Sequence, residues 1–471
     1  MANDYCTPLD IARIEQNFAD INPALSSVEA LYEANRCLYC FDAPCMHACP
    51  THIDVPGFIK KIATGNLLGS ARVIFDANPI GATCARVCPV EVLCEGACVE
   101  KTLLQKPIEI GRLQRHATDY AIENGRQIYE KGTPIGKSVG IVGSGPAGLS
   151  CSAYLARLGY DVTVYEQKPL AGGLDTYGMA EYKMPQKVSF DEVASIRRMG
   201  VDFKTRTQIV GEGSIPEKDN SDGEKVRFGA LAEEHDAIFL AVGLGDTHRM
   251  NIPGEDLPGV FDALDFIDRV KARDWKQVPL GEIVAVIGAG NTAIDAVTQA
   301  KRLGARRVLL IYRRTEKEAP AYDYELELAK KDGIEFVWQA SPVEILADDK
   351  GKHVAGLRCQ RTDGSDGQFS IGCDMVIKAI GQQKMRSFFE TVVGVSVDDK
   401  GRVVVNEQMQ TSKPGVYAGG DCVNGGAEAV DAAQMGKLAA RAIHANLTGE
   451  IVDFAGASVP DVGAERHHHH G

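Results

Sequence analysis

The chain has 471 residues, of which 44% are apolar and 24% are charged, an ordinary composition for a globular protein of two to four domains. Its 64 acidic and 51 basic residues give a net charge of −13, which would repel a phosphate backbone and argues against nucleic acid as a partner. The sequence lacks an apolar run of about 18 residues, so we expect no membrane span. The first residues lack the features of a secretory signal, and we expect a reducing, cytoplasmic location. The C-terminal RHHHHG is interpreted as the remnant of a tag.

Cysteines gather at the front of the chain, where nine of the thirteen fall within the first 98 residues. Residues 37–50, CLYCFDAPCMHACP, follow the pattern C-x2-C-x4-C-x3-C-P, and residues 84–98, CARVCPVEVLCEGAC, hold four more. In a reducing compartment such spacing favours metal over disulfides. Zinc usually takes two C-x2-C pairs, and only Cys37 and Cys40 form one. The Cys-Pro ending resembles the ferredoxin run, so the two quartets predict two [4Fe–4S] clusters, with zinc or reduced structural thiols as alternatives.

The segments around these cysteines have apolar residues at helical spacing. Residues 26–40, SSVEALYEANRCLYC, begin with a serine that can cap a helix, and residues 55–75 repeat the helical pattern. We therefore expect residues 1–130 to form a small α-helical domain around its clusters.

An apolar strand that ends at residue 142 leads into a glycine-rich turn and a helix. Gly143, Gly145 and Gly148 have the GxGxxG spacing, and the next strand ends at Glu166, 18 residues beyond the last glycine. Such glycines let the backbone approach a pyrophosphate, the helix N-terminus stabilises its charge, and the acid can bond ribose hydroxyls. The complete strand–turn–helix–strand context predicts a dinucleotide site rather than a mere tight turn.

A second unit of the same kind occupies residues 283–314. Gly288 and Gly290 repeat the spacing, Ala293 takes the third small position, and the unit ends in Arg313 and Arg314 instead of an acid. Arginine at this place can pair with the 2′-phosphate of NADP, whereas an acid would favour NAD. Two such units predict two dinucleotide sites.

Near the C-terminus, TSKPGVYAGGDCV delivers Gly420 and Asp421 to a turn after a strand. Together with the first glycine turn and with GGLDTYGMAEYKMP after Glu166, this is similar to the pattern of flavoproteins with two dinucleotide-binding domains. In that pattern Asp421 would meet the ribityl–pyrophosphate region of FAD. We expect a discontinuous FAD domain at residues 137–275 and 376–450, an inserted NAD(P) domain at residues 276–375, and a tail at residues 451–471.

The order of cysteine quartets, FAD domain and NAD(P) domain resembles one known family. With its motifs CLYCFDAPC, CARVCP, IEIGRLQR, YLARLGY and GARRV, the chain from about Cys37 to about Leu447 is similar to the flavin/iron–sulfur electron-transfer subunit of bacterial NAD-dependent dihydropyrimidine dehydrogenase. It also resembles the N-terminal half of the eukaryotic enzyme and the small subunit of glutamate synthase. The resemblance implies an α-helical iron–sulfur domain followed by a Rossmann-like α/β flavoprotein whose NAD(P) domain is inserted in its FAD domain.

The resemblance also implies which residues hold the cofactors. One [4Fe–4S] cluster would take Cys37, Cys40, Cys45 and Cys98, and the other Cys49, Cys88, Cys94 and Gln114, whereas spacing alone would have made Cys84 a ligand. The residues expected at FAD are Gly143, Gly145, Pro146, Ala147, Gly148, Glu166, Gly173, Leu174, Lys183, Gly381, Gly420 and Asp421. Those expected at NAD(P) are Gly288, Gly290, Asn291, Thr292, Arg313 and Arg314. Lys183 and Pro320 depart from the eukaryotic pattern, which has arginine at both places.

We interpret the chain as an electron-input subunit. A nicotinamide cofactor would give hydride to FAD, and the flavin would release the electrons singly to the two clusters. Hydride transfer requires no acid–base residue, so no catalytic residue is named. The remaining length leaves no room for a (β/α)8 barrel, and we expect an FMN-containing partner subunit of the dihydropyrimidine dehydrogenase type, acting on uracil or thymine. NADH is the expected donor because the resemblance is closest to the NAD-dependent subunit.

Three alternatives remain open from the sequence. The first is the small subunit of glutamate synthase, which has the same architecture. A dithiol reductase of the thioredoxin-reductase type would need a C-x-x-C pair in the nicotinamide domain, where only Cys359 and Cys373 lie. The third is a non-enzymatic scaffold whose cysteines bind zinc.

Overall fold

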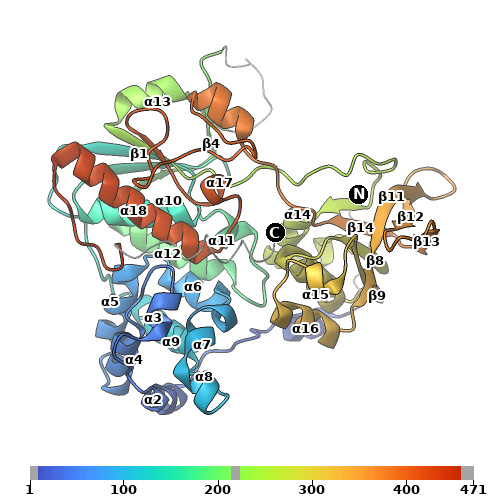
Figure 1. The fold of residues 1–471 in the computed structure, drawn as a ribbon, viewed down its shortest axis with the longest axis horizontal. Coiled ribbons are helices and arrows are strands. Elements are labelled where there is room, and N and C mark those ends of the chain that lie inside the picture. Colours follow the sequence, from blue (N-terminus) through green and yellow to red (C-terminus); the bar gives the residue numbers. More distant parts are fainter. Residues whose placement is uncertain (1–8, 214–222, 458–471) are drawn as a thin grey trace.

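The computed structural model describes residues 9–213 and 223–457. Figure 1 shows a unit of short helices at the front of the chain and two units built on β-sheets, one packed on the helices and one to the right. We call them the helical unit (residues 27–123), the first sheet unit (residues 138–240 and 416–448) and the second sheet unit (residues 260–378). The histidine run at the C-terminus lies outside the described residues. Within the two described ranges, no helix is long and apolar enough to cross a membrane.

The helical unit surrounds a small apolar core with short helices. The first of them begins at a capping box, in which Ser26 Oγ accepts from the Glu29 N–H and the Glu29 carboxylate accepts from the Ser26 N–H. A later helix buries Phe58, Ile59 and Ile62 along one face. The elements are α2 (Ser27–Arg36), α3 (Pro44–Ala48), α4 (Val55–Ala63), α5 (Leu67–Ala77), α6 (Gly81–Val87), the turn η1 (Val90–Val92), α7 (Cys94–Ala97), α8 (Val99–Leu103) and α9 (Ile110–Glu123).

The first sheet unit is a parallel sheet in the strand order β15-β6-β1-β2-β3. Because β15 pairs with β6 from far along the chain, this unit is discontinuous in sequence. The strands are β1 (Ser138–Val142), β2 (Asp161–Tyr165), β3 (Asp202–Lys204), β6 (Ala237–Leu240) and β15 (Val416–Ala418), with a small parallel pair, β4 (Thr207–Val210) and β5 (Glu224–Arg227). The helices are α10 (Pro146–Arg157), α11 (Leu174–Tyr177), α12 (Gln186–Arg198), α13 (Phe228–Glu234), α17 (Asp421–Asn424) and α18 (Ala429–Thr448).

The second sheet unit repeats the arrangement in the strand order β10-β9-β8-β14-β7, again parallel. The strands are β7 (Val260–Asp262), β8 (Ile283–Ile287), β9 (Arg307–Tyr312), β10 (Glu335–Trp338) and β14 (Met375–Lys378), and an antiparallel sheet of β11 (Ala340–Ala347), β12 (Val354–Arg361) and β13 (Gln368–Gly372) lies beside them. The helices and short turns are α14 (Ala263–Lys271), η2 (Trp275–Gln277), α15 (Asn291–Leu303), η3 (Glu316–Glu318) and α16 (Asp323–Lys331), and a π-helix, η4 (Phe388–Val393), follows the unit.

The border between the two sheet units differs from the expected residue 276. β7 pairs with β14, so it and α14 belong to the second sheet unit, which therefore begins near residue 260. A strand of three residues carries too little periodicity for sequence patterns to reveal it. Two chain segments connect the sheet units, and they run antiparallel, with Gly245 N–H donating to Gln383 O at 2.8 Å and His248 N–H to Gly381 O at 2.9 Å.

The two ends of the described chain each pack against one of the sheet units. Helix α1 (Ile11–Asn17) precedes the helical unit but packs on the second sheet unit, where Ile14 and Phe18 are buried in one core with Trp275. The Phe18 and Trp275 rings stack with centroids 5.0 Å apart. At the other end, Phe454 packs on Tyr154 of α10 with centroids 4.6 Å apart. The terminal segments therefore tie the three units together.

Helix α1 offers a matched pair of isoleucines that tests its docking. Ile14 is 1% exposed and Ile11 is 49% exposed on the same helix. Ile14→Ala should lower the free energy of unfolding by about 2–5 kcal/mol through lost burial and the cavity left behind. Ile11→Ala should change it by no more than about 0.5 kcal/mol. Urea unfolding of both variants measures the difference, and equal effects would contradict the docking of α1.

Candidate functional site

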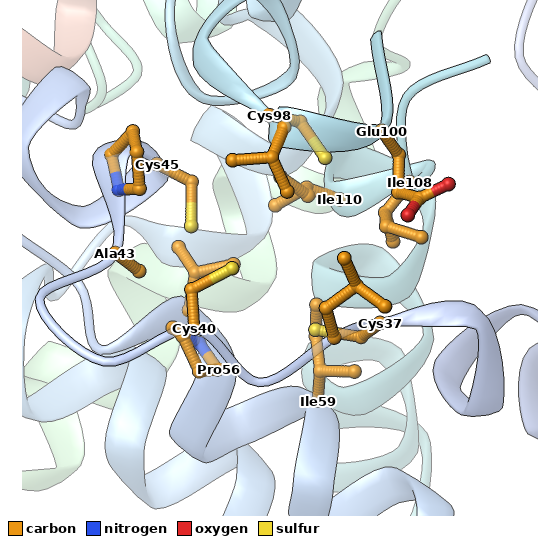
Figure 2. Close-up of a pocket in the computed structure, with 14 residues that line it drawn as sticks. Cys37, Cys40, Ala43, Cys45, Pro56, Ile59, Cys98, Glu100, Ile108 and Ile110 are labelled. Carbon is orange, nitrogen blue, oxygen red and sulfur yellow. The ribbon is translucent and has the colours of Figure 1, made fainter. Parts of the chain in front are cut away.

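Four cysteines of the helical unit line one cavity (Figure 2). Cys37 and Cys98 cap the C-terminal ends of α2 and α7, Cys45 lies in α3, and Cys40 lies in the loop between α2 and α3. Ile59, Ile108 and Ile110 are among the apolar residues that complete the wall. These are the four thiols that the family resemblance assigns to one cluster.

The raised pKa values of Cys37 and Cys45 keep these thiols of the cavity protonated until a metal binds. Burial and the neighbouring thiols Cys37 and Cys98 raise the pKa of Cys45 to about 12, and burial raises that of Cys37. Because only the thiolate is a ligand of iron, these side chains would lose their protons when a cationic iron centre binds. Within residues 9–213 and 223–457, no three His, Cys, Asp or Glu side chains converge as ligands of a single metal ion. The thiols instead surround a space with apolar walls, which fits a thiolate-bound cluster.

A second set of cysteines lies where the helical unit meets the first sheet unit. A hydrogen bond with Cys84, burial, and the nearby Cys49 and Cys94 hold the pKa of Cys88 well above its usual range. Burial, Glu95 and Cys49 do the same to the pKa of Cys94. Cys49, Cys84, Cys88 and Cys94 therefore lie close enough together for their thiols to interact electrostatically.

Gln114 projects from α9 and is 8% exposed. Its Nε2 donates to the Gly81 carbonyl at 2.8 Å, at the start of α6. Among the hydrogen bonds of the described residues, none is donated to its Oε1, so the amide oxygen remains available as a ligand. Gln114 remains the fourth ligand that the family resemblance predicts for the second set, and Cys84 remains the alternative from spacing.

The first glycine turn forms a backbone cradle at the end of β1. A side chain at Gly143 would lie 2.0 Å from the Ala241 carbonyl oxygen, and one at Gly148 would lie 2.1 Å from the Gly143 carbonyl oxygen, so both positions require glycine for close packing. Gly145 has an ordinary φ of −71°, and a Cβ there would meet nothing within 4 Å. Its missing side chain leaves open space at the N-terminus of α10, where a pyrophosphate fits.

Other residues expected at FAD gather around this cradle. A Cβ at Gly173 would lie 2.7 Å from Gly145 Cα, and one at Gly420 would lie 3.1 Å from Ala147 Cβ. Burial raises the pKa of Asp421, the first residue of α17, to about 6. Glu166 accepts from Ser144 Oγ at 2.6 Å and from the Lys168 N–H at 2.9 Å, which holds the acid beside the glycine turn.

Asp175 is a functional candidate that the sequence reasoning did not find. The side chain belongs to α11, directly after Gly173 and Leu174, and is 1% exposed. Both carboxylate oxygens are buried without a hydrogen-bond partner among the described residues. Burial and the nearby Glu192 hold its pKa well above the usual range. An orphaned acid beside the cradle indicates a polar ligand at this place, which supports the fit of a flavin nucleotide.

The second glycine turn forms the same kind of cradle at the end of β8. A Cβ at Gly288 would lie 2.1 Å from the Ala379 carbonyl oxygen, whereas one at Gly290 would meet nothing within 4 Å. Asn291 accepts from the Tyr322 N–H at 3.2 Å through Oδ1, and Thr292 is exposed beside it at the start of α15. The exposed Arg313 and Arg314 follow β9.

Two residues expected at FAD lie between the sheet units. The Lys183 ammonium bonds Asp295 Oδ1 at 2.8 Å and Glu325 Oε1 at 2.5 Å, both in the second sheet unit. Gly381 lies in one of the two connecting segments, with a φ of +90° that favours glycine. The structure thus brings the first glycine turn, Gly173, Gly420 and Asp421 to the first cradle and gives Lys183 ion pairs across the border between the sheet units.

Two family profiles match the chain. Residues 137–436 match the pyridine nucleotide-disulphide oxidoreductases, and residues 14–126 match the dihydropyrimidine dehydrogenase domain II with a 4Fe-4S cluster. The NAD-dependent dihydropyrimidine dehydrogenase subunit PreT of Escherichia coli is 34% identical over 92% of this chain and 98% of its own length. The glutamate synthase [NADPH] small chain of Escherichia coli is 32% identical over 93% of this chain and 95% of its own.

A solved structure gives the same fold. Thioredoxin reductase of Lactococcus lactis superposes with a TM-score of 0.53 at 22% identity, and the match covers 67% of this chain and 100% of that one. This likeness concerns the two sheet units as a fold, and at such identity it carries no functional argument.

The two cradles and the matches over most of the chain define an NAD(P)H-dependent flavin and iron–sulfur oxidoreductase. The chain belongs to the pyridine nucleotide-disulphide oxidoreductase family, within the group that includes the dihydropyrimidine dehydrogenase subunits and the glutamate synthase small chains. The expected family, fold class and oxidoreductase activity are confirmed. The zinc-binding scaffold is not supported.

The two open glycine positions give a pair of matched variants. Gly145→Val and Gly290→Val both place a side chain in open space, so both proteins should fold. Gly145→Val should purify without FAD because the side chain occupies the place of the pyrophosphate. Gly290→Val should keep FAD but lose its reduction by NAD(P)H. Flavin absorbance and anaerobic bleaching of the flavin measure the two losses, and retention of FAD in Gly145→Val would contradict the assignment.

Glu192 gives a prediction about pH. It is 3% exposed on α12 and accepts from the Ala82 and Thr83 N–H groups of α6, each at 3.1 Å, and from the Thr83 hydroxyl. Burial raises its pKa from 4.5 to about 7 despite these bonds. A raised folded-state pKa contributes stability that is full below pH 4.5 and is lost as the pH rises through 7.

Glu192→Gln removes this titration. From about pH 5 to about pH 8, the free energy of unfolding of the natural protein should fall relative to the variant, by on the order of 3 kcal/mol. Urea unfolding of both proteins across this range measures the difference. A constant difference would show that folding does not raise the pKa of Glu192, and a difference that grows in favour of the natural protein would show that folding lowers it.

Proposed function

We propose that this chain is the electron-input subunit of an enzyme of the dihydropyrimidine dehydrogenase type. NAD(P)H binds at the second cradle, FAD at the first, and two [4Fe–4S] clusters in the two cysteine sets. FAD accepts two electrons as hydride and releases them singly, and the clusters carry one each. The observation that supports this most is the cavity of Cys37, Cys40, Cys45 and Cys98 in the same chain as two dinucleotide cradles.

The packing supports an order for the relay. The second cysteine set adjoins the first sheet unit, since Glu192 of α12 bonds the start of α6, the helix that ends at Cys88. The first cavity is lined only by residues between Cys37 and Ile110, all in the helical unit. Electrons would therefore pass from FAD to the second cluster, then to the first, and leave from there.

Large apolar side chains are exposed on the two segments that carry ligands of the first cluster. Leu38, which lines the first cavity, is 54% exposed, and Phe41, next to Cys40, is 100% exposed. Leu103 and Leu104, at the end of α8, are each 67% exposed. Gathered apolar side chains on a surface mark a protein interface. We assign this face to an FMN-containing catalytic subunit that supplies the pyrimidine site.

NADH remains the expected donor. The PreT subunits, 34% identical, are named NAD-dependent. Arg313 and Arg314 offer guanidinium groups at the end of β9, and Pro320 stands where the eukaryotic pattern has a further arginine. Glu316 and Glu318 follow in the same loop and add negative charge, although Glu316 is paired with Lys330.

The second candidate is the small subunit of a glutamate synthase. The 32% identity over nearly the full length of the Escherichia coli small chain favours it, since both kinds of subunit share this architecture. The two functions differ in the partner that receives the electrons.

The test is partner-dependent uracil reduction. The isolated protein should reduce ferricyanide or dyes with NADH, because such acceptors take electrons from exposed carriers, and it should not reduce uracil. Addition of a dihydropyrimidine-type FMN subunit should start uracil-dependent NADH oxidation. Cys49→Ser should keep dye reduction at the flavin and lose transfer to the partner. Uracil turnover by the single chain would contradict the proposal, and activity only with a glutamate synthase large subunit would favour the second candidate.

The exit face has its own test. Phe41→Ser removes the most exposed of the apolar side chains and should raise the KM for the partner at least about tenfold, or about 1.4 kcal/mol, with dye reduction unchanged. The control is Ile451→Ser, which changes another exposed apolar residue, 72% exposed, outside the helical unit. An unchanged KM for Phe41→Ser would place the partner elsewhere.

A further inference from the structure

Lys437 is a buried lysine in the middle of α18. Its side chain is among the largest that are fully buried, with 0% exposure. The ammonium donates to the Thr51 carbonyl at 3.0 Å and to the Ala455 carbonyl at 2.5 Å. One side chain thus joins the first sheet unit, the helical unit and the C-terminal segment.

No carboxylate compensates this charge. Across the described ranges, every other wholly buried lysine ammonium has an acidic partner within 4 Å, as Lys271 has Glu181 at 4.0 Å, but none pairs with Lys437. Burial of a cation without a counter-charge is costly, and two neutral carbonyls offset that cost only in part. Burial accordingly lowers the pKa of Lys437 to about 7, and an anion beside the ammonium would raise that pKa and keep the side chain charged.

The group nearest to this role is the second cysteine set. Lys437 bonds the carbonyl of Thr51, and Thr51 Oγ1 lies 3.4 Å from Cys49 Sγ. The charged and titratable groups that face the ammonium are Cys49 and His52 of the helical unit's loop, Asp76 of α5 and Arg157 of α10. Asp76 is already paired with Arg157 at 3.0 Å. The Cys49 thiolate, as a cluster ligand, is thus the negative charge that the Lys437 ammonium would stabilise.

Helix α18 also connects this place to the first cradle. A Cβ at Gly436, the preceding residue, would lie 2.3 Å from the Ala147 carbonyl oxygen in the first turn of α10. The same helix thus packs against the glycine turn and places the Lys437 ammonium on the Thr51 carbonyl, two residues from Cys49. The position of the ammonium is fixed relative to both expected carriers.

We propose that Lys437 is the counter-charge of the iron–sulfur cluster held by Cys49, a positioning residue that raises the midpoint potential of this cluster. The inference rests on the proposed function, since it takes Cys49 as a cluster ligand. When one electron moves from the flavin to the cluster, the cluster becomes more negative by one charge, and no proton need follow. A fixed ammonium favours that reduced state over the oxidised one. Lys437 thereby makes the second cluster the acceptor for electrons that leave the flavin.

The test is a redox titration of the purified, cluster-loaded protein monitored by electron paramagnetic resonance. Lys437→Met keeps an unbranched buried side chain and removes the charge. The second cluster should become harder to reduce by at least about tenfold in its equilibrium constant, or about 59 mV for one electron. The midpoints of the first cluster and of FAD should not move. The second cluster is recognised as the signal that Gln114→Cys shifts.

Two variants separate charge from packing. Lys437→Arg keeps the charge and should keep the midpoint near that of the natural protein. Arg441→Gln removes a charge one turn further along α18, at a half-buried position, and should leave both clusters unchanged. Loss of the second signal in Lys437→Met but not in Lys437→Arg would also support a need for charge.

Two results would overturn the inference. The first is an unchanged second midpoint in Lys437→Met with full iron and sulfide content. The second is loss of the cluster in both Lys437→Met and Lys437→Arg, because shape rather than charge would then be what matters. A natural protein without iron would instead contradict the proposed function itself, so the two failures are distinguishable.

Discussion

The buried polar contact between the helical unit and the first sheet unit is the constraint on which the relay depends, because electrons pass between carriers only across short, fixed gaps. Tyr154 of α10 donates to the Asp76 carbonyl at 2.7 Å, and Arg157 bonds the Asp76 carboxylate at 3.0 Å. Glu192 and Lys437 add bonds from two further helices to the segments that carry the second cysteine set. Hydrogen bonds in such dry surroundings are strong when satisfied and costly when broken, so they fix one arrangement of the two units.

The second sheet unit is attached differently. Two antiparallel segments connect it, and ion pairs such as those of Lys183 with Asp295 and of Arg273 with Glu181 cross the border. Ala180 and Tyr182 of the first sheet unit are also buried in the core of the second, so this border combines ion pairs with apolar packing.

Sequence patterns located the two cradles because the glycine spacing has a local cause. Gly143 and Gly148 must pack closely and Gly145 must leave space, and each requirement acts within a few residues of the motif. Glu192 and Lys437 had no such signal, since their roles arise from contacts between units far apart in the chain. Asp175 stands out only in the fold, where both of its buried carboxylate oxygens lack a partner among the described residues. Lys183 could be placed near FAD by analogy, yet its partners, Asp295 and Glu325, lie over a hundred residues away.

The central claim is that two iron–sulfur centres lie in this one chain, one inside the helical unit and one at its border with the flavin unit. Anomalous diffraction at the iron absorption edge, on crystals of protein prepared without oxygen, tests it most directly. The account predicts two iron centres, one among Cys37, Cys40, Cys45 and Cys98 and one bound by Cys49, Cys88, Cys94 and Gln114. A single centre, a second centre bound by Cys84 in place of Gln114, or mononuclear metal in either place would contradict it.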